Sequence, residues 1–147
     1  MSTTPPNERY LLAMAAIMRS GHWLTDRISA TLKPLGLTEP QYNVLRLLIE
    51  ARGEPLAQQD IQAGMLQPSS NVSRIVDRLL EKGLVTRSIN PENRRKMDIA
   101  LTEEGRRLEK KASKQVLAFH ATIAGNLSDR ELGQLTAALK KFRSSPD

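Results

Sequence analysis

The sequence predicts a mainly α-helical fold that carries one small β-hairpin. Apolar residues recur at intervals of three and four over most of the chain, which is the helical period. Between residues 84 and 101 the interval changes to two, which is the period of a strand. Three helical segments stand close together just before this hairpin, and longer helical segments flank the whole region. These observations define the expected order of elements.

Composition narrows the class of protein. The 147 residues include 22 Lys and Arg against 16 Asp and Glu, and the resulting net charge of +6 favours an acidic partner such as nucleic acid. Cysteine is absent, which excludes disulfides and thiolate chemistry and suits a reducing compartment. The first residues show no signal-peptide pattern and no run long enough to span a bilayer. We therefore expect a cytoplasmic protein that makes no membrane contact.

The first helix is expected from Asn7 to Leu35. Its apolar positions keep one face through the whole segment, although Gly21 weakens the helix and could mark a bend. Pro34 closes the segment, because the residue before a proline avoids helical angles. The apolar positions are Leu11, Met14, Ala15, Met18, Leu24, Ile28, Leu32 and Leu35.

Three shorter helices are predicted next. Thr38 and Gln41 form a capping box at the start of the first, whose buried stripe is Tyr42, Leu45, Leu48 and Ile49. The second is predicted over the stretch LAQQDIQAGM, residues 56–65. The third covers residues 68–82, beginning with a proline and ending before Gly83. Its apolar residues are Val72, Ile75, Val76, Leu79 and Leu80.

The rest of the chain is predicted as a hairpin and two helices. Strands are expected at 84–89 and 96–101, joined by the turn Asn-Pro-Glu-Asn. Thr102 can cap a helix that runs to about residue 126. Ser128 and Glu131 form a capping box for the last helix, with Leu127 and Leu132 as its hydrophobic staple.

Helix, short connection, helix and basic hairpin is the order of a winged helix-turn-helix. A helix fits the major groove of B-DNA, where each base pair shows a distinct hydrogen-bonding pattern. The polar face of the helix at 68–82 is therefore the candidate recognition surface, although caps and a solvated helix face also explain such residues. The candidate residues are Ser69, Ser70, Asn71, Ser73, Arg74 and Arg78.

The hairpin carries the second candidate DNA contact. Arg94, Arg95 and Lys96 are adjacent near its tip, and Arg87 lies on its first strand. Arginine side chains at such a tip can enter a minor groove, where narrow A·T tracts concentrate negative potential. A solvated loop is the other explanation of the charge cluster. Its position right after a candidate recognition helix favours DNA.

Three segments resemble the MarR family of bacterial transcriptional regulators: LTEPQYNVL, SSNVSRIVDRLLEKGLV and NPENRRKMDIALTEEG. The resemblance implies one MarR-type unit over 1–147, with a winged helix-turn-helix at 38–102 and dimerisation helices at 7–35 and 103–145. It further implies a homodimer that binds a pseudo-palindromic operator in double-stranded DNA. Such proteins are commonly repressors released by a small, often aromatic or phenolic, effector.

One position departs from the family's pattern. The family usually has Asp two residues before the wing arginine, where the carboxylate orients the guanidinium, and this chain has Asn93 before Arg95. A charged bidentate partner is replaced by at most a neutral hydrogen bond. The departure leaves the reach of Arg95 intact but puts its fixed direction in question.

The sequence also offers candidate residues for a ligand pocket. Arg19, His22 and Trp23 on the first helix, together with Tyr42, could line an effector cavity, although ordinary core and interface packing also explains them. The apolar stripes of the terminal helices favour a homodimer that buries them, the alternative being a monomer whose helices fold back on their own domain.

No enzyme is predicted. The sequence has two distant histidines, no phosphate-binding glycine loop and no nucleophile motif, so no catalytic residues, metal site or cofactor are expected. The remaining alternative is an architectural or RNA-associated winged-helix protein without a ligand response. Against RNA, the few aromatic residues offer no stacking platform for bases.

Overall fold

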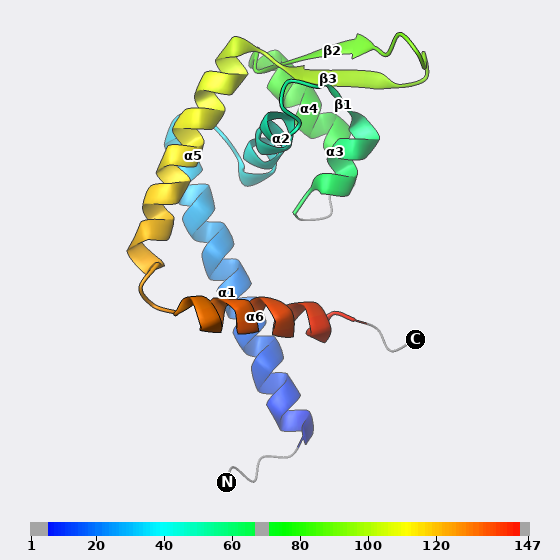
Figure 1. Cartoon of the computed structure of the whole chain (residues 1–147). Helices are drawn as coiled ribbons and strands as arrows, with labels where there is room; N and C mark the ends of the chain where they lie inside the picture. Colours follow the sequence, from blue (N-terminus) through cyan, green and yellow to red (C-terminus); the bar gives the residue numbers. More distant parts are fainter. Residues whose placement is uncertain (1–5, 67–70, 145–147) are drawn as a thin grey trace. The chain divides into compact units, whose positions relative to one another are not determined.

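The computed structural model describes residues 6–66 and 71–144, and Figure 1 shows the elements in chain order. The chain divides into two compact units, Met1–Val116 and Leu117–Asp147, which are described separately. The first unit contains the hairpin and the shorter helices that precede it. The second contains the end of one long helix and all of the last helix.

The first helix is continuous. α1 (Pro6–Leu32) passes through Gly21 without interruption, so the segment forms one long helix and not two. A 3-10 turn, η1 (Lys33–Leu35), follows and includes the predicted terminating proline. Gly36 then takes a φ of 71°, a left-handed conformation that glycine adopts at no steric cost, and it turns the chain toward the next helix.

The predicted capping box starts α2 (Glu39–Glu50). The Thr38 hydroxyl accepts from the Gln41 amide, and the Gln41 side chain accepts from the Thr38 amide. α3 (Gln58–Gly64) and α4 (Val72–Glu81) follow. Asn71, expected inside the third short helix, is instead the N-cap that precedes it. Leu56 and Ala57, expected to open the second short helix, form a strand.

That strand, β1 (Leu56–Ala57), joins the hairpin in a three-stranded antiparallel sheet. The hairpin itself is confirmed as β2 (Val85–Ile89) and β3 (Met97–Leu101), and β3 lies between β2 and β1. Ile99 is fully buried and stands opposite Arg87 on one side and Leu56 on the other. The periodicity of the sequence showed two of the three strands.

The core of the first unit gathers the apolar faces of its helices around the sheet. Most predicted stripe residues of α2 and α4 are buried, and the intervals of three and four explain why, since such residues share a helix face. The largest completely buried side chains are Leu32, Val44, Leu45, Ile61, Val72, Val76, Leu79 and Ile99.

The start of α5 (Glu103–Ile123) is fastened to the base of the hairpin. The Thr102 hydroxyl donates to the Gly83 carbonyl at 2.7 Å and accepts from the Gly105 amide at 3.0 Å. The Thr102 amide donates to the Leu84 carbonyl. Gly105 is buried so closely that a Cβ there would lie 2.0 Å from the Leu84 carbonyl oxygen. Only glycine fits this junction.

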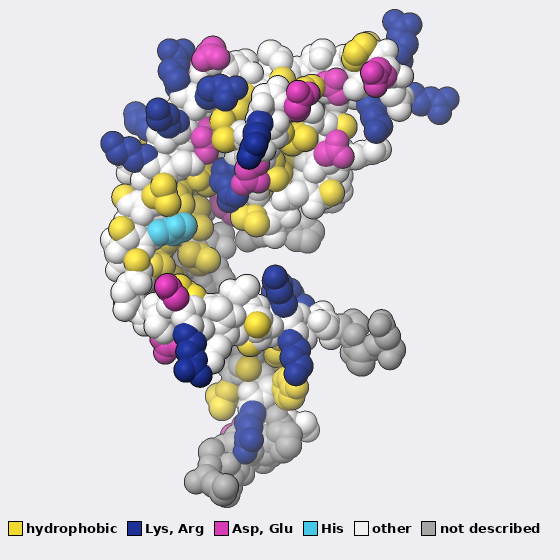
Figure 2. All heavy atoms as spheres, in the orientation of Figure 1, with side chains coloured by type: hydrophobic (Ala, Val, Ile, Leu, Met, Phe, Trp, Pro, Cys, Tyr) yellow, Lys and Arg dark blue, Asp and Glu magenta, His cyan; other side chains and the backbone are white. Residues whose placement is uncertain are grey.

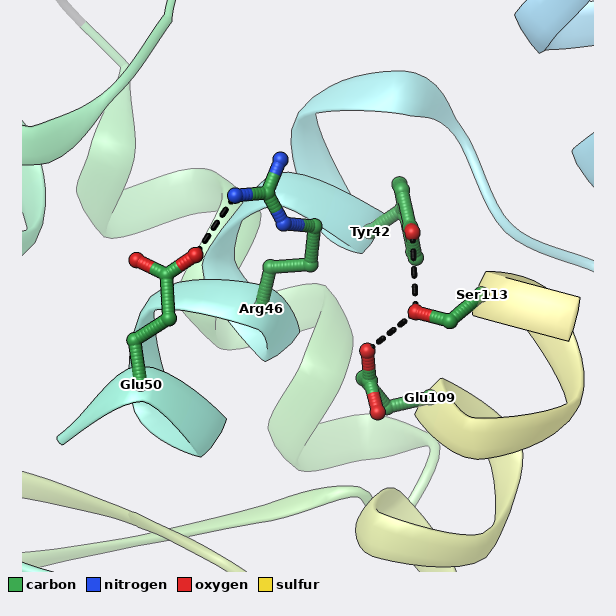
Figure 3. A network of polar contacts seen from close by, with 5 residues as sticks. All are labelled: Tyr42, Arg46, Glu50, Glu109 and Ser113. Carbon is green, nitrogen blue, oxygen red and sulfur yellow. Dashed lines mark hydrogen bonds and ion pairs between the residues drawn. The ribbon is translucent and has the colours of Figure 1, made fainter. Parts of the chain in front are cut away.

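A polar contact joins α2 to α5 inside the first unit (Figure 3). The Ser113 hydroxyl donates to the Glu109 carboxylate, so the Tyr42 hydroxyl must be the donor in its 2.9 Å contact with Ser113. Glu109 is only 7% exposed. Nearby, the hydrogen bond to Glu50 is the main cause that raises the pKa of the Arg46 guanidinium.

The second unit contains α6 (Asp129–Phe142), which begins with the predicted capping box. The Ser128 hydroxyl accepts from the Glu131 amide, while the Glu131 carboxylate accepts from the Ser128 amide at 2.8 Å. That last hydrogen bond lowers the pKa of the Glu131 carboxyl. Across the described ranges, no helix combines the length and apolar character that a bilayer crossing requires.

Candidate nucleic-acid interface

The exposed face of α4 carries the predicted recognition residues that the structure describes. Asn71, Ser73, Arg74 and Arg78 are exposed, while Ser69 and Ser70 lie outside the described residues. Three of them, Asn71, Arg74 and Arg78, line a shallow groove of about 280 Å³ whose other wall is the start of α2. The Arg74 side chain makes no hydrogen bond or ion pair within residues 6–66 and 71–144. It is thus available to an external acceptor.

Two of the predicted basic contacts are engaged within the protein. Arg87 on β2 forms an ion pair with Asp77 on α4, with 3.0 Å between the guanidinium and the carboxylate. Arg78 forms a similar pair with Glu81, one turn further along α4, at 3.1 Å. The first pair links the wing to α4. Arg87 therefore has a structural contact in addition to its predicted place at the DNA surface.

The basic cluster stands free at the tip of the hairpin. Arg94, Arg95 and Lys96 are all exposed, and their side chains form no hydrogen bond or ion pair with any residue that the structure describes. Figure 2 shows Lys and Arg side chains projecting from the region that the hairpin tip occupies in Figure 1. Three neighbouring cations that have no partner in the part of the chain that the structure describes are candidates for phosphate contacts.

The departure at position 93 has a definite structural outcome. The Asn93 side-chain oxygen accepts a hydrogen bond from the backbone amide of Arg95, at 3.1 Å. It thereby fixes the backbone at Arg95. The hydrogen bond from Asn93 to the Arg95 guanidinium, considered from the family pattern, is not made, and the guanidinium has no partner among the described residues.

A notch beside the wing contains residues that sequence patterns did not reveal. It measures about 260 Å³ and is lined by the start of α3 and by the residues that lead into the N-terminal end of β3. Gln58 and Gln59 form one wall, and Arg95 and Lys96 form the other. Their proximity follows from the β1–β3 register, in which Ala57 stands opposite Asp98. The sequence analysis missed Gln58 and Gln59 because it did not predict β1, whose pairing with β3 brings them next to the wing.

The predicted ligand-pocket residues lie in different environments. His22 lines a surface hollow of about 540 Å³, together with Gly21, Leu24, Thr25, Ile28, Glu39 and Leu66. Its imidazole is 3.2 Å from the Asp26 carboxylate. Tyr42 is instead buried, with its hydroxyl on Ser113, and Arg19 and Trp23 are exposed on α1 but are not among the lining residues. In the described parts of the chain, no three His, Asp or Glu side chains are grouped as metal ligands.

Comparison with known proteins identifies the family. A sequence profile described as the MarR family matches residues 35–96. The chain is 30% identical over 128 residues to an HTH-type transcriptional repressor of Mycobacterium tuberculosis, covering 87% of this chain and 91% of the relative. It is 35% identical to CouR of Rhodococcus jostii RHA1 bound to p-coumaroyl-CoA, with a TM-score of 0.73 and coverage of 90% and 93%.

A further solved structure shows a related protein with DNA. A mutant of Staphylococcus aureus MepR bound to an oligodeoxyribonucleotide is 25% identical with a TM-score of 0.59, covering 92% of this chain and 94% of that one. Helical elements, a winged hairpin, and similarity over nearly the whole length of several relatives agree. This chain belongs to the MarR family of transcriptional regulators.

Proposed function

We propose that this chain is a homodimeric repressor that binds a pseudo-palindromic DNA operator and is released by a small ligand. The observation that carries the DNA-binding part is a set of exposed cations that have no partner among the described residues: Arg74 on α4, and Arg94, Arg95 and Lys96 on the wing. A helix can read the major groove while a basic wing contacts the adjacent minor groove. The oligonucleotide bound to MepR supports this proposal.

The dimer is supported by apolar side chains that each unit leaves exposed. On α1 these include Tyr10, Leu11, Leu12, Met14 and Met18, and on α6 they include Leu132, Leu135 and Phe142. Exposed apolar patches of this kind mark protein–protein contacts, and two copies of one chain can bury the same faces in a two-fold arrangement. Such a dimer would present two recognition helices about one DNA turn, roughly 34 Å, apart.

DNA binding is tested with duplexes from the region upstream of the chain's own gene. We expect a footprint with two protected half-sites and an affinity that falls steeply as salt rises, by about 0.9 in log affinity per log salt for each neutralised phosphate. Arg74→Ala should weaken binding by roughly 5- to 150-fold. Arg130→Ala on α6 removes the same charge outside the winged region and should leave the affinity nearly unchanged.

Two results would contradict this part of the proposal. Equal binding to every duplex in proportion to its length would favour an architectural protein. A preference for single-stranded RNA would favour the RNA-associated alternative.

The ligand response is supported by the hollow at His22, whose size falls within the range of small-molecule sites, about 300–1,000 Å³. The p-coumaroyl-CoA bound to CouR makes aromatic acids and their CoA thioesters the first compounds to test. Trp23 is the single tryptophan of the chain and follows His22 directly, so its fluorescence reports on binding. We expect an effector to change that fluorescence and to release operator DNA over the same concentration range. A fluorescence change without DNA release would contradict regulation by ligand.

A further inference from the structure

The tip of the wing is held by side-chain hydrogen bonds together with one turn, in which the Lys96 amide donates to the Asn93 carbonyl at 2.9 Å. Residues 90–96 join β2 to β3, a longer connection than the roughly two to five residues usual in hairpins. All of residues 91–96 are exposed, so no apolar contact with the core fixes them. Their order must therefore come from hydrogen bonds inside the loop.

Asn90 supplies most of these hydrogen bonds. Its side-chain oxygen accepts from the amides of Glu92 and Asn93, at 2.9 and 2.8 Å. Its side-chain nitrogen donates to both carboxylate oxygens of Asp98, at 3.1 Å each. This orientation of the Asn90 side-chain amide is the one that the chemistry requires. The two backbone N–H groups need the Asn90 oxygen as an acceptor, and the Asp98 carboxylate needs the Asn90 nitrogen as a donor. One amide group thus fastens the loop to β3.

Asp98 is a firm anchor for the loop. It lies on the central strand of the sheet, opposite Ala57 of β1 and Ser88 of β2, and its side chain is half-buried. In addition, the backbone amide of Asn90 donates to the Lys96 carbonyl, and the backbone amide of Arg95 donates to the Asn93 side-chain oxygen. The backbone around the wing arginines is consequently ordered before any DNA is present.

We propose that Asn90 and Asp98 are positioning residues for DNA binding, holding the wing tip in the shape in which Arg94 and Arg95 meet the duplex. This inference rests on the proposed function. Neither guanidinium has a partner within the described residues, so the backbone alone sets where each one starts. Ordering the loop in the free protein removes an entropic cost that would otherwise oppose binding.

The decisive test is a swap of the two side chains. In Asn90→Asp, two carboxylates face each other, and their repulsion should loosen the tip. In the double variant Asn90→Asp with Asp98→Asn, the amide at 98 donates to the carboxylate at 90, whose other oxygen still accepts from the loop amides. The swap also restores the net charge of the wild type. We therefore expect the swap to restore DNA binding by re-forming the hydrogen bond between positions 90 and 98. The separate charge control below tests the effect of charge.

We expect Asn90→Asp to bind operator DNA roughly tenfold more weakly than the wild type, and the swap to recover affinity to within about threefold. Hydrogen exchange at the amides of Glu92 and Asn93, followed by NMR without DNA, should be faster in Asn90→Asp and slow again in the swap. The thermal midpoint should change by only a few degrees, because the tip contributes nothing to the core.

A charge control separates positioning from repulsion of DNA. Thr86→Asp adds one carboxylate to an exposed site on β2 without touching the pair. The inference is overturned if Asn90→Asp binds as well as Thr86→Asp, or if the swap fails to restore affinity. Equal amide exchange in all variants would overturn the positioning role alone. If the wild type binds no duplex at all, the proposed function itself fails, and amide exchange still decides whether the pair orders the tip.

Discussion

Several single side chains in this protein act by completing networks of hydrogen bonds between elements. The contact that joins Tyr42, Ser113 and Glu109 is directional, because a carboxylate can only accept and Ser113 has one proton to give. Removing the middle hydroxyl therefore leaves a buried donor and a buried acceptor without partners (Figure 3). Unsatisfied buried groups cost more than the hydrogen bond contributes when formed.

Ser113→Ala should accordingly lower the free energy of unfolding by about 1–3 kcal/mol, whereas Tyr42→Phe should cost about 1 kcal/mol. The Tyr42→Phe/Ser113→Ala double variant should be more stable than the sum of the two losses predicts, because residues in contact are not additive. Urea unfolding at one fixed protein concentration measures all four proteins. Additive losses would show that the two hydroxyls do not interact.

At this scale the sequence predicted residue types better than residue contacts. Arg94, Arg95 and Lys96 were correctly expected to be a cluster at a hairpin tip. The ion pair of Arg87 with Asp77 and the anchoring of Asn90 on Asp98 were not foreseen. Both depend on how a strand lies against another element, which local periodicity does not encode.

Several helices of this protein begin at residues whose side chains cap the first backbone amides, and one needs a glycine in its first turn. The boxes at Thr38 and Ser128 were visible in the sequence, because their spacing is local. β1 was not, since two residues are too few to show a period and their partner strand lies about forty residues further on. The close approach of Gly105 to the Leu84 carbonyl belongs to the same class of long-range facts.

Gly105→Ala should destabilise the first unit by about 3 kcal/mol, because its Cβ would overlap a backbone oxygen that a side-chain rotation cannot move. Gly21→Ala is the matched control. That glycine is also inside a helix but has no atom within 4 Å of an added Cβ, so alanine should stabilise by about 0.5–1 kcal/mol through helix propensity. Thermal and urea unfolding measure the stability of both variants. Equal changes in stability for Gly105→Ala and Gly21→Ala would contradict the packing argument.

The cap of α6 should titrate at low pH. The Ser128 amide donates to the ionised Glu131 carboxylate and lowers its pKa below the usual value of 4.5. The stabilisation is therefore complete above the unfolded pKa and is lost as pH falls through the lower folded pKa. NMR titration of the Glu131 carboxyl should show this depressed pKa. Ser128→Pro, which removes the amide donor, should bring the pKa back toward 4.5, and an unchanged value would refute the assignment.

Both units of the chain carry large apolar side chains that are exposed among the described residues. On α1 this surface includes Leu12, whose side chain is 64% exposed, and other large apolar residues nearby. The second unit has its own exposed apolar residues on α6. The helical stripes could be recognised from the sequence, but their exposure could not, because periodicity marks an apolar face without saying what covers it.

Leu12→Glu should shift the protein from dimer to monomer, since a carboxylate buried between subunits has no compensating partner. Ile89→Glu is the control, because Ile89 is a similarly exposed apolar residue, at 56%, but lies on the hairpin. Sedimentation velocity over a range of concentrations should show a dimer for the wild type and Ile89→Glu. A dimer that persists in Leu12→Glu would place the interface elsewhere.

The fastening at Thr102 has a mechanical consequence. Thr102 binds the residues that end the turn after α4, and it also caps α5, so three elements meet at one pivot. A rotation of the first turn of α5 cannot be absorbed by bending the hairpin alone, because both ends of the hairpin are tied to that pivot. We therefore expect the wing and the C-terminal end of α4 to move together when the first turn of α5 moves. A displacement of that turn would then change both surfaces proposed to contact DNA at the same time.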